Sequence, residues 1–293
     1  DRHGWSELPE GAAWYDYLVR NQTTTDLTPV EIFALGEKEI ARIKNEMERL
    51  RSASGFNGTL GEYARELSEK APRAYSSRAD LIAGYDGILR AISPHLAKLF
   101  GAIPKSPFEV RTIEKYHEQS APPDGSRPGV FYVNARGIET NPRRAAEALF
   151  LHEAIPGHHF QISLQREQTH RPRFQRFADY TAFTEGWALY AESLGAELGL
   201  YRDASHNFNR LNSELFRAVR LVVDVGLHRK NWTREQAIQF IIDSTGGGES
   251  GGLRSRSLHR PACASPQLQD RPAENHRAAR QSGKHLRRQI RHP

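Results

Sequence analysis

LHEAIPGHHFQ, residues 151–161, places a His-Glu pair, a Pro-Gly break and two adjacent histidines within one short segment. A zinc hydrolase commonly carries two histidines four residues apart on one helix, with a glutamate after the first as general base. Pro156 stands where that second histidine would be. On a regular helix, neither His158 nor His159 could share one ion with His152.

Pro156 cannot donate a hydrogen bond to the carbonyl of His152, and its ring crowds that carbonyl. We therefore expect a kink or bulge here, relaxed by Gly157, that carries one of the later histidines back beside His152. The alternative is a helix break that happens to be rich in surface or core histidines. Two histidine groups around the break, followed by a separate glutamate motif, favour a metal site.

FTEGWALYAES, residues 183–193, supplies two candidate carboxylates on one predicted helix face. Two histidines and one glutamate leave a fourth zinc position open for water, as in catalytic zinc sites. Glu185, near the helix start, is the better ligand candidate, and Glu192 suits an acceptor that holds a histidine ring. For either glutamate taken alone, a solvated helical residue is the better interpretation.

Helical patterns extend outward from this segment in both directions. Thr28, Pro29 and Glu31 form a helix start that we expect to run to about Arg51. Further helices are predicted at 59–70, 77–100, 141–154, 180–198, 208–229 and 233–244, with Pro72 and Pro94 as interruptions, Asn141 as a cap and Pro142 in a first turn.

Two segments, 107–118 and 130–135, are rich in β-branched and aromatic residues and are joined by a Pro/Gly/Ser loop at 120–129. They predict a short hairpin. The expected fold is mostly α, with a small β-hairpin or sheet beside the active-site helix.

Arg220, Asp224 and His228 recur at four-residue intervals on a helix otherwise filled with Leu and Val. Polar groups on such a stripe need partners. They could stabilise an oxyanion or bind a peptide carboxylate, with Arg220 suited to bidentate binding. A buried structural ion pair explains them equally well.

The net charge of +6 belongs to the end of the chain. Residues 251–293 hold ten Lys/Arg and two Asp/Glu, which leaves 31 basic and 33 acidic residues for the rest. A single cysteine, Cys263, excludes internal disulfides and a cysteine-built metal site. No apolar run approaches the roughly 20 residues of a membrane span, so we expect a soluble chain without a targeting signal.

LHEAIPGHHFQ, FTEGWALYAESLG and RAVRLVVDVGLHRKNWTREQA, in that order, resemble the bacterial family called domain of unknown function 885 from about Trp14 to about Gly246. The resemblance implies a zincin-like metallopeptidase domain over residues 1–250, without indicating which peptide it cleaves. Family members usually carry more helix and often an export signal before this point. The chain therefore looks truncated, and a periplasmic, exported or cytoplasmic location stays open.

The motifs also resemble a stretched version of those in thimet-type oligopeptidases. Matching Gly157-His158 to that pattern favours His158 over His159 as a ligand. The resemblance implies that Glu153 takes a proton from zinc-bound water as it attacks a peptide carbonyl. Together with the residue patterns above, we expect one Zn²⁺ held by His152, His158 and Glu185 and catalytic roles for His228 and Arg220. Arg220 and, by analogy with that family, Tyr132 are expected to contact substrate, and His159, Glu192 and Asp224 are expected to have supporting or alternative ligand roles.

Residues 251–293 lose helical periodicity and become basic. Permissible codons for 257–280, read one base later, give a sequence that resembles the C-terminal helical segment of the same family. We infer a frameshift between about Gly246 and Leu253 and an out-of-frame tail. Two alternatives to an active peptidase follow: a metal-binding but catalytically impaired fragment, and a nucleic-acid binder through its basic tail, which the frameshift disfavours. The sequence does not predict an oligomeric state.

Overall fold

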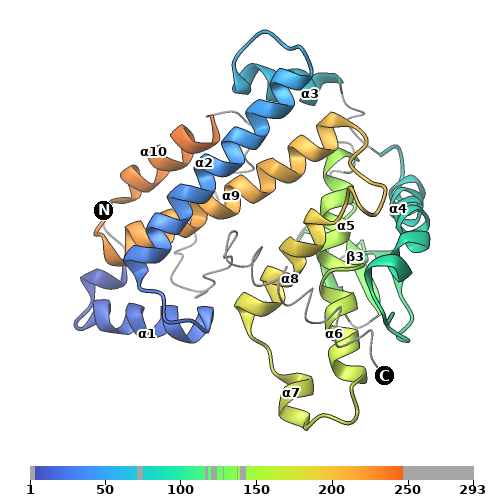
Figure 1. The fold of residues 1–293 in the computed structure, drawn as a ribbon, viewed down its shortest axis with the longest axis horizontal. Coiled ribbons are helices and arrows are strands. Elements are labelled where there is room, and N and C mark those ends of the chain that lie inside the picture. The colour runs from blue at the N-terminus through green and yellow to red at the C-terminus, as the bar shows by residue number, and fades with distance from the viewer. Residues whose placement is uncertain are drawn as a thin grey trace. The chain divides into compact units, whose positions relative to one another are not determined.

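The computed structural model describes residues 4–70, 75–115, 118–119, 124–127, 129–136, 138 and 143–246. Within these residues the fold is mostly helical with one small sheet, as predicted (Figure 1). The basic tail, Pro72, Asn141 and Pro142 lie outside the described residues. No helix in the described part of the chain is long and apolar enough to cross a membrane.

The chain divides into two compact units. Among described residues, the first contains 4–65, Tyr180–Gly186 and 211–246, and the second contains those between Glu66 and Asp179 together with Trp187–Arg210. Three helices contribute residues to both units: α3 (Leu60–Lys70), α8 (Thr181–Ser193) and α9 (Ala204–Arg229).

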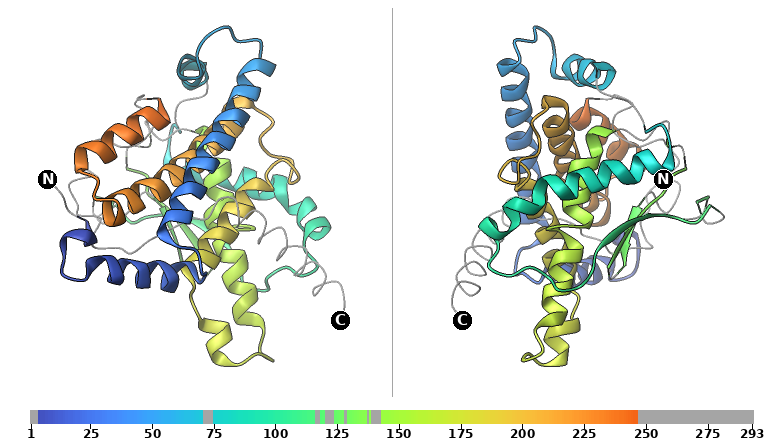
Figure 2. Two further views of the ribbon diagram at one scale, coloured as in Figure 1. Left: turned by 60° about the vertical axis from the view of Figure 1, so that its left-hand side comes forward. Right: turned by 90° about the vertical axis from the view of Figure 1, so that its right-hand side faces the viewer.

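The first unit is built on two long helices. Its other elements are η1 (Trp5–Glu7), α1 (Gly11–Thr23) and α10 (Arg234–Thr245). Helix α2 (Pro29–Ala53) starts as predicted, because Thr28 and Glu31 cap each other's backbone N–H groups in a capping box. Helices α2 and α9 lie side by side and antiparallel (Figures 1 and 2), and they approach so closely that a Cβ at Gly36 would lie 2.6 Å from Val222 Cγ2.

The second unit contains α4 (Arg78–Leu99), η3 (Arg143–Ala145), α5 (Ala146–Glu153), α6 (His158–Glu167) and α7 (Arg173–Phe177). The predicted interruption at Pro94 is wrong, because α4 continues through it. Pro94 is exposed, so water can reach the Arg90 carbonyl whose helical partner is missing.

The small sheet differs from the predicted hairpin in its pairing. Strand β1 (Glu109–Thr112) runs parallel to the central strand β3 (Val130–Val133), and β2 (Asp124–Arg127) pairs antiparallel with β3. The hairpin is therefore formed by β2 and β3, and β2 falls in the predicted loop. Polar residues of low β-propensity form this strand, because backbone hydrogen bonds to β3 are available whatever the side chains. Phe131 packs edge-on against Phe150, which places the sheet beside α5.

Candidate metal centre

The helix is fully interrupted between α5 and α6, whereas the sequence predicted a kink or bulge there. Helix α5 ends at Glu153 and α6 begins at His158, with a cis peptide bond between Ile155 and Pro156. The Trp187 indole donates a hydrogen bond of 2.7 Å to the Pro156 carbonyl. The helix ends here because Pro156 cannot continue the backbone hydrogen bonding of α5.

Gly157 passes directly against the end of α5. A Cβ at this position would lie 1.8 Å from the His152 carbonyl oxygen and 2.3 Å from that of Leu151. Both obstacles are backbone atoms, which a small side-chain adjustment cannot move. Only glycine fits this turn.

We therefore expect Gly157→Ala to lower the free energy of unfolding by at least about 3 kcal/mol, because the turn must move to admit a methyl group. Thermal or urea unfolding checks this. Gly61→Ala is the matched control: Gly61 lies inside α3 with no neighbouring atom within 4 Å of its Cβ position, so the change should be neutral or stabilising. Equal losses for the two variants would contradict the close approach.

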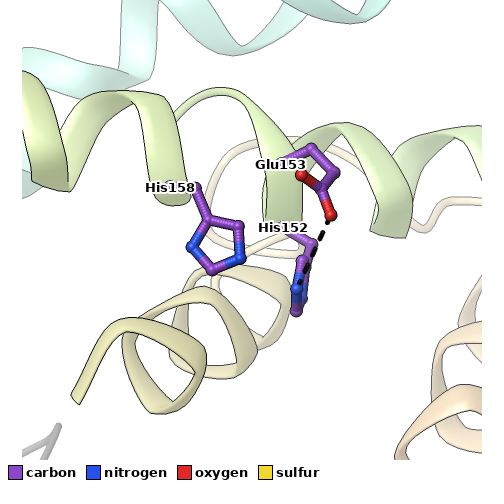
Figure 3. A group of neighbouring side chains, drawn as sticks. All are labelled: His152, Glu153 and His158. Carbon is purple, nitrogen blue, oxygen red and sulfur yellow. Dashed lines mark ion pairs between the residues drawn. The ribbon is translucent and has the colours of Figure 1, made fainter. Parts of the chain in front are cut away.

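The break brings together side chains that a regular helix would separate. One ligand atom from each of His152, Glu153 and His158 lies within 4.8 Å of the others (Figure 3). The two imidazole rings meet edge to face with centroids 4.7 Å apart, and both histidines are buried. This is the group of His, Cys, Asp and Glu in the described part of the chain with the spacing of a metal site.

Glu192 of α8 fixes the orientation of the His152 ring. Its Oε1 lies 2.7 Å from His152 Nδ1, and Glu192 is 4% exposed. In the neutral imidazole, Nδ1–H then donates to the carboxylate and Nε2 carries the lone pair that would coordinate a metal. His152 Nε2 lies 3.9 Å from Glu153 Oε1.

His159 has a different environment from His158. Its ring packs against Phe108 with centroids 4.9 Å apart. Burial lowers the pKa of His159, and the nearby Glu167 carboxylate only partly opposes this effect. The structure therefore groups His158, and not His159, with His152.

Glu185 belongs to the first unit, and Tyr132 to the second. Glu185 Oε2 lies 3.5 Å from Arg217 Nη1, and Tyr132 is half-buried on the central strand β3. The metal-binding role expected for Glu185 and the substrate contact expected for Tyr132 stay predictions.

The polar stripe of α9 is mostly engaged in contacts within the first unit. Tyr15 Oη donates to Asp224 Oδ2 at 2.7 Å, and the Trp5 backbone N–H donates to His228 Nδ1 at 3.2 Å. Burial raises the pKa of Asp224 and lowers that of His228. Arg220 is exposed. These contacts fit the structural interpretation of Asp224 and His228, and a catalytic role for His228 or Arg220 stays a prediction.

Sequence reasoning missed Tyr15, Tyr201, Glu147 and His206, because each finds its partner far along the chain. Glu147 Oε2 accepts hydrogen bonds from the Tyr201 backbone N–H, at 2.9 Å, and from His206 Nδ1, at 3.0 Å. No local spacing signals such contacts. They connect α5, which carries His152, to the start of α9.

The hydrogen bond to Glu147 raises the pKa of His206, although burial and Arg144 oppose it and Asp203 assists. A histidine whose pKa is raised on folding stabilises the protein fully below its ordinary pKa near 6.5, and that stabilisation is lost as pH rises through the raised value. We expect His206→Gln to cost about 1 kcal/mol at pH 5.5 and less at pH 8.5. Urea unfolding of both proteins across this range checks it, and a cost that grows with pH would contradict it.

Two solved structures of bacterial proteins are similar to this chain. The "putative lipoprotein" from Colwellia psychrerythraea is 34% identical, with a TM-score of 0.80, over 98% of this chain and 50% of that one. A "putative lipoprotein of unknown function" from Shewanella oneidensis is 18% identical, with a TM-score of 0.71, over 99% of this chain and 55% of that one. The chain thus spans about half the length of these solved relatives.

No curated protein matches the chain. The family of bacterial proteins of unknown function DUF885 matches residues 1–252, which is most of the sequence. The chain therefore belongs to the DUF885 family.

Proposed function

We propose that this chain carries the zinc centre of a peptide hydrolase. The observation that carries the proposal is the buried group of His152, Glu153 and His158 formed by the break at Pro156 and Gly157. Two imidazoles with carboxylates nearby suit Zn²⁺, which prefers nitrogen donors supplemented by oxygen. Glu192, hydrogen-bonded to His152, is the outer partner that zinc-binding histidines usually have.

His152 and His158 would hold the ion, with Glu185 as the third ligand on the strength of the sequence motif alone. Glu153 is the other candidate for that position. A glutamate that directly follows the first histidine of such a motif is, however, commonly the general base. We therefore assign Glu153 to proton transfer.

Zinc in this position would supply Lewis-acid chemistry, polarising an oxygen and making water nucleophilic near neutral pH. Glu153 follows His152 on α5, so its carboxylate stands beside the position where the ion would bind. As general base it would take the proton from the attacking water and pass it to the amine leaving the cleaved peptide. Glu192 would keep the His152 ring in the tautomer that leaves Nε2 as ligand.

Metal analysis and peptide cleavage test this proposal together. The purified chain is dialysed against Zn²⁺, its metal content is measured, and a mixture of peptides is incubated with it before and after chelation. We expect one zinc per chain and cleavage that chelation removes. A chain that binds no zinc would contradict the proposal at its first step.

A second candidate is a fragment that binds zinc but hydrolyses peptides poorly. It is favoured because the family match ends at residue 252, close to the point where the sequence turns basic and aperiodic. We propose that the remaining residues are read out of frame. Sequencing the gene and repeating the assays with a frame-restored chain distinguish the two candidates: activity only after repair would favour the fragment, and equal activity would exclude it.

The solved relatives bear on location. The 34%-identical relative is called a putative lipoprotein, and on this ground we propose an exported location among the alternatives left open by the sequence. Cell fractionation with an antibody to the protein would test this, and recovery with the cytosol would contradict it.

A further inference from the structure

Tyr201 contacts α5, which carries His152, and α8, which carries Glu192. Its backbone N–H donates to Glu147 Oε2 on α5, and its hydroxyl donates to the Glu192 carbonyl on α8, each at 2.9 Å. Glu192 Oε1 is in turn 2.7 Å from His152 Nδ1, also on α5. Tyr201 and Glu192 therefore form a series of contacts that begins and ends on α5.

Tyr201 follows α8 in a turn that returns its ring to the end of that helix. Its φ of +58° is in the left-handed region, and its ring rests on Gly195, where a Cβ would lie 2.0 Å from Tyr201 Cε2. Helix α8 ends at Ser193, so the Glu192 carbonyl belongs to the last turn, which lacks intrahelical donors. The Gly195 N–H reaches this carbonyl at 3.3 Å, and the Tyr201 hydroxyl makes the shorter contact.

We propose that Tyr201 is a positioning residue of the metal centre: its hydroxyl fixes the end of α8 so that the Glu192 carboxylate orients the His152 ring. The inference rests on the proposed function, because a metal must bind for the orientation to matter. Removing an outer partner of a ligand typically costs 10- to 100-fold in metal affinity. Tyr201 acts one contact further out, so we expect about a 3- to 10-fold loss on removal of its hydroxyl.

The test compares Tyr201→Phe with Tyr75→Phe in the full chain, using zinc titration against a competing chelator. Phenylalanine keeps the ring on Gly195, so folding should be retained, and thermal unfolding of the zinc-free proteins checks this. Tyr75 is buried in the same unit with its ring against the Arg143 guanidinium, 4.3 Å from the ring centroid. Its hydroxyl can be removed as a matched control, and zinc affinity should then change by less than about twofold.

A double-mutant cycle shows whether Tyr201 acts through Glu192. In a Glu192→Gln background, Tyr201→Phe should have little further effect on zinc affinity, because the orientation is already lost. The visible spectrum of bound Co²⁺ should shift in Tyr201→Phe and not in Tyr75→Phe.

Three results would overturn the inference while zinc binding by the wild type leaves the proposed function standing: an unchanged zinc affinity in Tyr201→Phe, an equal loss in Tyr75→Phe, or a fully additive cycle. A wild-type chain that binds no zinc would overturn the proposed function, and this inference with it.

Discussion

Glu153→Gln is expected to lower kcat for peptide cleavage by about 1000-fold while leaving zinc bound. Glutamine has nearly the same shape as glutamate but cannot take a proton from the attacking water, and general-base catalysis typically contributes 100- to 10,000-fold. The measurement is kcat together with zinc content, on whichever form of the chain, original or frame-restored, is active.

Glu197→Gln is the control for this prediction, because Glu197 is an exposed glutamate in the same unit. It should change neither kcat nor zinc content. A Glu153→Gln protein that loses its zinc would show that Glu153 is a ligand and not the base. One that keeps both zinc and activity would remove Glu153 from the reaction.

His152→Gln and His158→Gln are each expected to weaken zinc binding by at least about 100-fold, because each removes one of very few ligands from a site whose total binding energy they share. His159→Gln should change zinc affinity by less than about threefold, since His159 packs against Phe108 and lies outside the group of His152, Glu153 and His158. Zinc titration of the three variants measures this directly.

These variants also separate the two adjacent histidines. Loss of zinc in His159→Gln and retention in His158→Gln would reverse the assignment. Thermal unfolding of each zinc-free variant is measured alongside, because His152, His158 and His159 are all buried and their replacement also affects packing.

Local signals predicted much of the fold. The capping box at Thr28 and the start of α10 after Thr233 are both set by residues within one turn of the helix end. The pairing of β1 with β3 was predicted, but its parallel orientation was not, because the intervening strand β2 lies in a segment of low β-propensity that was predicted to be a loop. The Pro94 prediction failed because an exposed proline in a long amphipathic helix removes only one hydrogen bond.

The candidate site was predictable where its residues are close in sequence. His152, Glu153 and His158 are neighbours along the chain, and the Pro-Gly pair between them signals the break that brings them together. The partners that hold this group were harder to find. Tyr201 has no motif of its own, and its two contacts reach Glu147, 54 residues earlier, and Glu192, 9 residues earlier.

The most direct measurement is the anomalous scattering of zinc in crystals of the zinc-soaked chain. We expect one strong peak about 2.0–2.1 Å from His152 Nε2 and from one ring nitrogen of His158, with a Glu185 carboxylate oxygen as the next protein ligand. A peak beside His159, or zinc found only away from His152 and His158, would contradict the zinc centre proposed for this protein.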